Sequence, residues 1–93
     1  MTFVMMAKYN VGKESRTKFV KEFDKVLGKK FRNSTGFKGN KILLSRKHDK
    51  ELMAINEWRK KEDFLKAMDA ETQKAMRDAG ISDKLVYHEA FDR

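Results

Sequence analysis

Residues 37–58 read FKGNKILLSRKHDKELMAINEW. Two segments of this stretch, Phe37–Arg46 and Leu52–Trp58, are rich in residues that favour β-strands, and the charged residues Lys47–Lys50 between them are typical of a hairpin loop. The centre of the chain is therefore predicted to form two adjacent antiparallel strands. One helical pattern and one further strand flank this hairpin on each side.

A helical pattern precedes the hairpin. Its apolar residues recur at helical spacing from Phe19 to Leu27. Ser15 or a near neighbour is placed to cap this helix, and Gly28 is placed to end it in the left-handed conformation. The opposite stripe is basic and is most simply a solvated face. It consists of Lys18, Lys21, Lys25 and Lys29.

A second helical pattern follows the hairpin. It runs from Glu62 to Ala79, and Gly80 stands at its end. Asp69 lies inside this pattern and can cap a helix, so we expect the helix to bend or restart there. Glu62 and Asp63 stand where the N-terminus of a helix favours negative charge.

Two outer strands, Phe3–Tyr9 and Leu85–Phe91, complete the pattern. The resulting order is βαββαβ, which predicts an α+β fold of the ferredoxin-like type. We expect a single domain over residues 1–93, in which a four-stranded antiparallel sheet carries both helices on one face.

The predicted strands are apolar on both faces, as in Val4–Ala7, Ile42–Leu44 and Leu52–Ile55. An antiparallel sheet with one face in water should instead alternate apolar and polar residues. The face away from the helices would be an exposed apolar patch, and the chain has no third layer to cover it. We therefore expect a homodimer formed through the sheet face, with a different covering protein as the alternative.

The composition excludes several classes of site. The 93 residues include no Cys, so disulfides, thiolate metal sites and Cys nucleophiles are ruled out, and a reducing, cytoplasmic location is expected. The longest early apolar run, Phe3–Ala7, is too short for a signal peptide or a membrane span. No membrane partner is therefore expected.

The net charge is +8, and the segment Lys8–Lys50 alone carries 14 basic and 4 acidic residues. This excess raises the question of nucleic-acid binding, because RNA-recognition domains share the βαββαβ order. Those domains stack bases on aromatic residues of their central strands, and Leu52–Trp58 lacks the required Gly-aromatic signature. A nucleic acid is therefore not the expected partner, and binding through the basic stripe of Lys18, Lys21, Lys25 and Lys29 is left open as the alternative.

Three motifs resemble the antibiotic biosynthesis monooxygenase (ABM) domain family of the dimeric α/β barrel superfamily. They are Gly36-Phe37-Lys38-Gly39, Asn56-Glu57-Trp58 and Lys61-Glu62-Asp63-Phe64. The resemblance covers nearly the whole chain. It implies a dimer whose sheets stack face to face, with a pocket between sheet and helices in each subunit. The family includes cofactor-independent quinone and polyketide oxygenases, haem degraders, and members with no established reaction.

The haem-degrading branch can be tested on the residues. Its members resemble one another in carrying a Trp and an iron-binding His on the second helix, and an ungapped count from Trp58 places Ala67 and Arg77 at these positions. Arginine is not a practical iron ligand, and this helix contains no His. We therefore predict that the chain does not degrade haem by that mechanism.

Three polar side chains are candidates for catalysis: His88, Asn56 and Tyr9. If the face of Asn56 lines the pocket, its amide points inward and must find a partner. Tyr9 ends the first strand near the expected pocket mouth and can donate a hydrogen bond to a substrate oxygen. His88 is a candidate acid or base, and its strand position fits a dimer-interface residue as well.

Four further residues are candidates for substrate binding: Trp58, Asn10, Met5 and Met68. Trp58 either offers a flat surface to an aromatic substrate or anchors the corner between strand and helix. Asn10 either contacts the substrate or is an ordinary turn residue. The methionines form either an adaptable cavity wall or gap-filling core.

No metal site is predicted, because the neighbouring side chains of His48-Asp49 and His88-Glu89 diverge on a strand and three converging ligands are not found. The resemblance then implies that the partner is a hydrophobic or aromatic small molecule and that the chain is a cofactor-independent monooxygenase acting on a quinol or polyketide-like aromatic. The alternatives are a non-enzymatic small-molecule-binding or accessory dimer and, at a greater distance, a haem-binding relative.

Overall fold

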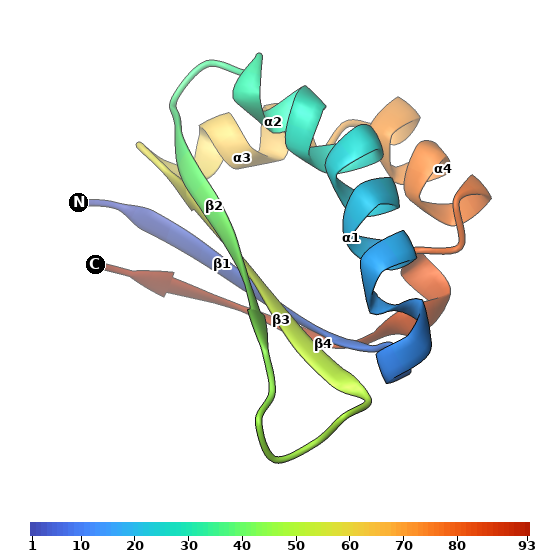
Figure 1. The fold of residues 1–93 in the computed structure, drawn as a ribbon. Coiled ribbons are helices and arrows are strands. Elements are labelled where there is room, and N and C mark those ends of the chain that lie inside the picture. Colours follow the sequence, from blue (N-terminus) through green and yellow to red (C-terminus); the bar gives the residue numbers. More distant parts are fainter.

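The computed structural model describes residues 1–93 and contains one antiparallel sheet of four strands. The strands are β1 (Phe3–Asn10), β2 (Phe37–Leu44), β3 (Glu51–Trp58) and β4 (Leu85–Asp92), in the spatial order β2-β3-β1-β4. All helices lie on one face of this sheet (Figure 1). The predicted α+β ferredoxin-like fold is confirmed.

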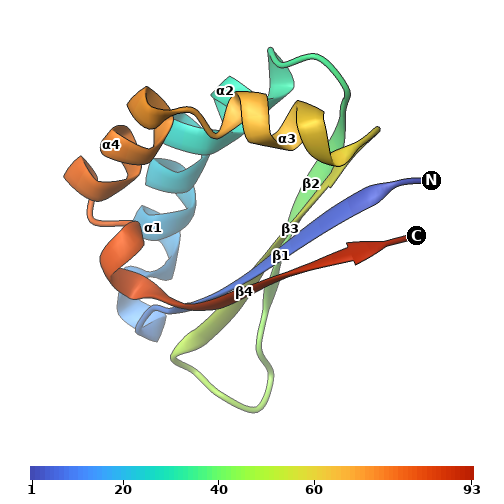
Figure 2. The same ribbon diagram turned by 180° about the vertical axis from the view of Figure 1, so that it is seen from behind.

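The strand ends follow local hydrogen bonds. β2 ends at Leu44, two residues before the predicted Arg46, because the Ser45 hydroxyl accepts a hydrogen bond from the backbone N–H of His48 at 2.9 Å and starts the hairpin turn. At the other end of the sheet, Thr2 and Arg93 exchange two backbone hydrogen bonds, so the chain termini lie side by side (Figure 2).

The first helical region differs from the prediction at both ends. It consists of a 3₁₀ turn (Lys13–Ser15), α1 (Arg16–Phe23), a π-helical segment (Asp24–Gly28) and α2 (Lys29–Arg32). The Ser15 side chain makes no capping hydrogen bond, because the 3₁₀ turn already supplies backbone bonds there. Gly28 does not end the helix either: its φ is −57°, and the helix continues so that Phe31 is buried in the core.

The second helical region restarts where the sequence predicted. α3 (Lys61–Ala67) and α4 (Ala70–Asp78) are separated at Asp69, whose carboxylate accepts a hydrogen bond from the backbone N–H of Thr72 at 2.8 Å. Gly80 follows α4 with φ of 76°, and a 3₁₀ turn (Ser82–Lys84) leads into β4. No helix is long and apolar enough to cross a membrane.

The core lies between the helices and the inner face of the sheet. On β3 the residues alternate strictly, so that Leu52, Ala54, Asn56 and Trp58 are buried against the helices. The opposite, outer face carries Met53 and Ile55 from the same strand, and neighbouring strands add Met6, Leu43, Tyr87 and Phe91 to it. Leu43, Tyr87 and Phe91 are 44–50% exposed, so this outer face exposes apolar side chains. Charged residues share the face with them: Lys8, Lys41, Glu51, Glu57 and Glu89.

Candidate functional site

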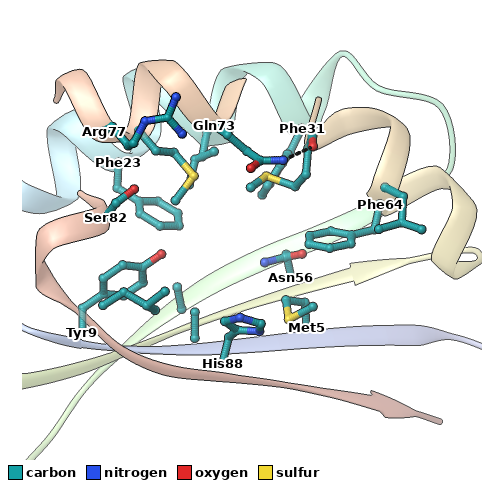
Figure 3. A pocket seen from close by; sticks show the side chains of 17 residues that line it. Met5, Tyr9, Phe23, Phe31, Asn56, Phe64, Gln73, Arg77, Ser82 and His88 are labelled. Carbon is teal, nitrogen blue, oxygen red and sulfur yellow. Dashed lines mark hydrogen bonds between the residues drawn. The ribbon is translucent and has the colours of Figure 1, made fainter. Parts of the chain in front are cut away.

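A cavity of about 420 Å³ lies between the inner face of the sheet and the helices (Figure 3). This volume is within the usual range for small-molecule sites. β1, β3 and β4 form one wall, while the two helical regions form the other. Twelve of its 17 lining residues are hydrophobic, and the remaining five are Asn56, Gln73, Arg77, Ser82 and His88.

Asn56 brings a fixed amide to the cavity wall. Its side chain is 5% exposed, and its Oδ1 accepts a 2.6 Å hydrogen bond from Nε1 of Trp58, which lies on the same face of β3. This hydrogen bond gives the buried amide oxygen of Asn56 the partner that the sequence predicted it must find. The Nδ2 group donates to no protein atom, and Figure 3 shows it directed along the cavity. Asn56 therefore presents a hydrogen-bond donor to a ligand.

Tyr9 contributes a second donor. Its ring packs against Phe19 and Phe23, with centroid distances of 5.1 and 5.8 Å, and its hydroxyl points into the cavity without a protein partner (Figure 3). Burial raises the pKa of Tyr9 to about 12. The phenol therefore keeps its proton at neutral pH and can donate it in a hydrogen bond.

His88 is the one imidazole at the cavity. It lies on β4 opposite Ala7 of β1, and its ring projects toward the cavity beside Met5 (Figure 3). No Asp or Glu lines the cavity, and no group of three His, Asp or Glu side chains gathers as a metal site would require. His88 is thus the candidate proton acceptor of this site.

The structure brings five of the seven predicted site residues together and leaves two outside. Tyr9, Asn56, His88, Met5 and Met68 all line the cavity. Asn10 is exposed at the end of β1 and does not reach the cavity.

Trp58 is the second residue outside the cavity lining. It is fully buried, because Phe31, Phe37 and Phe64 surround its ring at centroid distances of 5.1–6.0 Å. It therefore contacts Asn56 rather than the cavity.

Three polar residues of the cavity were not among the predicted site residues: Gln73, Ser82 and Arg77, the last of which was named only at the iron-ligand position of the haem degraders. Gln73 and Arg77 share a helical stripe with the buried Met76, and this i, i+3, i+4 spacing is the signal that could have found them. The Gln73 side chain donates a 3.0 Å hydrogen bond to the carbonyl of Met68 and so bridges the break between α3 and α4 (Figure 3).

Comparison with solved structures shows the same fold in other proteins. SnoaB, a cofactor-independent oxygenase from Streptomyces nogalater, was solved as a point mutant that is 17% identical, with 99% of this chain and 92% of that chain covered and a TM-score of 0.81. A conserved protein from Methanosarcina mazei Go1 is 11% identical, with 100% and 93% covered and a TM-score of 0.80. At these identities the likeness establishes the fold alone.

Comparison of the sequence itself is more specific. No curated protein sequence gives a significant match. The family model described as "Antibiotic biosynthesis monooxygenase" matches residues 2–79, which include the strands β1, β2 and β3 and both helical regions. The chain belongs to the antibiotic biosynthesis monooxygenase family.

Proposed function

We propose that the protein is a homodimeric, cofactor-independent monooxygenase that acts on an electron-rich phenol or quinol. The observation that carries this proposal is the largely apolar cavity in which two hydrogen-bond donors, Asn56 and Tyr9, accompany one imidazole, His88. Substrates of this kind supply the electrons for oxygen themselves once they are deprotonated, so the protein must bind, orient and deprotonate them.

The proposed reaction begins when His88 takes the phenolic proton. The Asn56 amide and the Tyr9 hydroxyl then stabilise the resulting oxyanion by donating hydrogen bonds to it. A ring carbon that carries a hydrogen and lies ortho or para to this oxygen transfers electrons to O₂ and forms a C–O bond, and the His88 imidazolium returns its proton to the terminal peroxide oxygen, which gives a hydroperoxide. Cleavage of the O–O bond with loss of the hydrogen on that carbon releases water and leaves a carbonyl group. One oxygen atom thus enters the product and the other leaves as water.

The proposed dimer rests on the outer face of the sheet. Met6, Met53 and Ile55 lie at its centre, and the more exposed Leu43, Tyr87 and Phe91 extend it. Exposed apolar side chains that share one face commonly mark an interaction site. A second copy of the chain offers the same apolar surface in a twofold arrangement, so each copy covers the other.

Oxygen uptake tests the activity. Chelator-treated protein is given a panel of quinols, naphthols and anthrones, and uptake is compared among wild type, His88→Ala, Asn56→Ala and His48→Ala. His48 lies in the exposed hairpin loop, so His48→Ala is the matched control. We expect His88→Ala and Asn56→Ala each to lose about 10²-fold in rate while His48→Ala does not change. Binding without turnover by wild type would instead support the non-enzymatic binding role.

A further inference from the structure

Arg77 is the one arginine or lysine that lines the cavity, and no carboxylate accompanies it there. The other polar groups of the lining add donors: the Asn56 amide nitrogen, the Tyr9 hydroxyl and the Ser82 hydroxyl. A cavity that offers donors and one permanent positive charge, without an opposing negative charge, favours a ligand with an anionic oxygen group.

The Arg77 side chain has no ion pair and donates no hydrogen bond within the protein. Its sequence neighbour Asp78 is paired with Lys74 at 2.9 Å instead. By contrast, most arginines of this chain bind an oxygen atom of the protein: Arg16, Arg32, Arg59 and Arg93. Arg77 is exposed, so its guanidinium lies at the open side of the cavity and is free to bind a ligand there.

The position of Arg77 separates it from Asn56 and His88. In Figure 3, Arg77 and Ser82 lie at one end of the cavity, whereas Asn56 and Phe64 lie toward the other end. Tyr9 lies on the sheet wall at the same end as Arg77 and Ser82, and His88 lies on the sheet wall between the two ends (Figure 3). A ligand that reaches both ends would place one group at Arg77 and its reacting ring over the sheet wall.

We propose that the ligand is an aromatic carboxylate whose carboxylate binds Arg77, with the Ser82 hydroxyl as an additional donor, while its aromatic body occupies the apolar part of the cavity. This proposal rests on the proposed function, because it specifies the substrate class of the same site. A guanidinium binds a carboxylate through two parallel hydrogen bonds, so Arg77 selects this group in both charge and shape.

Two probes of nearly equal shape test the charge requirement: anthracene-2-carboxylate and anthracene-2-carboxamide, titrated by fluorescence at 0.15 M salt. We expect the carboxylate to bind about tenfold more tightly than the carboxamide, as a charge-assisted pair at a partly exposed site should. Arg77→Gln should abolish this preference, and Arg77→Lys should restore part of it. Lys74→Gln removes the same charge from the same helix outside the cavity and should keep the preference.

The outcomes separate this proposal from the proposed function. Equal binding of the two probes by wild type would overturn the carboxylate assignment and leave the oxygenase proposal standing. An equal loss of preference in Lys74→Gln and Arg77→Gln would also overturn it, because diffuse attraction to a chain of net charge +8 would then explain the binding. Failure of both probes to bind would contradict the aromatic-binding cavity and both proposals with it.

Discussion

Trp58 Nε1 donates a 2.6 Å hydrogen bond to Oδ1 of Asn56, two residues earlier on the same face of β3. Both groups are buried, so each satisfies a polar atom of the other that would otherwise lack a partner. The bond also fixes the orientation of the amide, with oxygen toward the indole and nitrogen toward the cavity. A residue that does not line the cavity therefore determines which hydrogen-bonding group the cavity presents.

Trp58→Phe should reduce the free energy of unfolding by about 1–3 kcal/mol, because it leaves Oδ1 of Asn56 buried without a partner. Urea denaturation measures this change. Circular dichroism is the signal to follow, because Trp58 is the only tryptophan of the chain and its substitution removes the tryptophan fluorescence. In a double-mutant cycle with Asn56→Leu we expect a coupling energy of at least about 0.5 kcal/mol. Additive effects of the two substitutions would show that the hydrogen bond contributes nothing.

Gly36→Ala should be strongly destabilising for two reasons. Gly36 has φ of 81°, which strains any residue with a Cβ, and a Cβ there would collide with the buried carboxylate of Asp63. We expect a loss of at least about 2 kcal/mol of unfolding free energy in thermal or urea denaturation.

Two other glycines separate these causes. Gly80 has φ of 76° but open space around its Cα, so Gly80→Ala should cost about 1 kcal/mol from strain alone. Gly12 has φ of −58° and open space, so Gly12→Ala should change stability by less than about 0.5 kcal/mol. Equal effects at Gly36 and Gly80 would contradict a steric role for Asp63.

Tyr9→Phe should make the protein less sensitive to alkali. Burial raises the pKa of Tyr9 to about 12, above the value of about 10 expected in the unfolded chain. The folded state therefore holds the phenolic proton more tightly. The resulting stability is fully present below about pH 10 and is lost as the pH rises toward 12, by on the order of 2–3 kcal/mol. The urea midpoints of wild type and Tyr9→Phe, measured between pH 8 and 12, check this prediction. The same dependence of the midpoint on pH in both proteins would refute it.

Ile55→Glu should weaken self-association, because Ile55 lies on the outer face of the sheet and a charge there would be buried in the proposed dimer. Sedimentation equilibrium at micromolar concentration should show wild type at twice the 11.0 kDa chain mass and Ile55→Glu shifted toward the monomer. Leu65→Glu places the same change on α3, away from this face, and should remain dimeric. A wild type that is monodisperse at 11.0 kDa would contradict the dimer.

The sequence by itself determined the features that depend on local patterns. The βαββαβ order follows from alternation and helical spacing, and the restart at Asp69 follows from a capping side chain that binds a backbone N–H three residues away. Strand alternation also grouped Tyr9 with Met5 on the first strand and Asn56 with Trp58 on the third, because side chains two residues apart point the same way. The register between these strands, which puts both groups on the cavity face, belongs to the tertiary structure.

The tertiary structure decided the features that depend on contacts between distant segments. Gly28 was predicted to end the first helix. The helix instead continues for another turn, because Phe31 packs on the rings of Trp58 and Phe37. The carboxylate of Asp63 is buried against the backbone of Gly36, which lies 27 positions earlier in the chain. Trp58 is kept from the cavity by the rings of Phe31, Phe37 and Phe64. Whether Arg77 reaches the cavity depends on how its helix is rotated against the sheet. Helix periodicity defines a stripe of residues but does not define the rotation, which is set by close packing of the whole core.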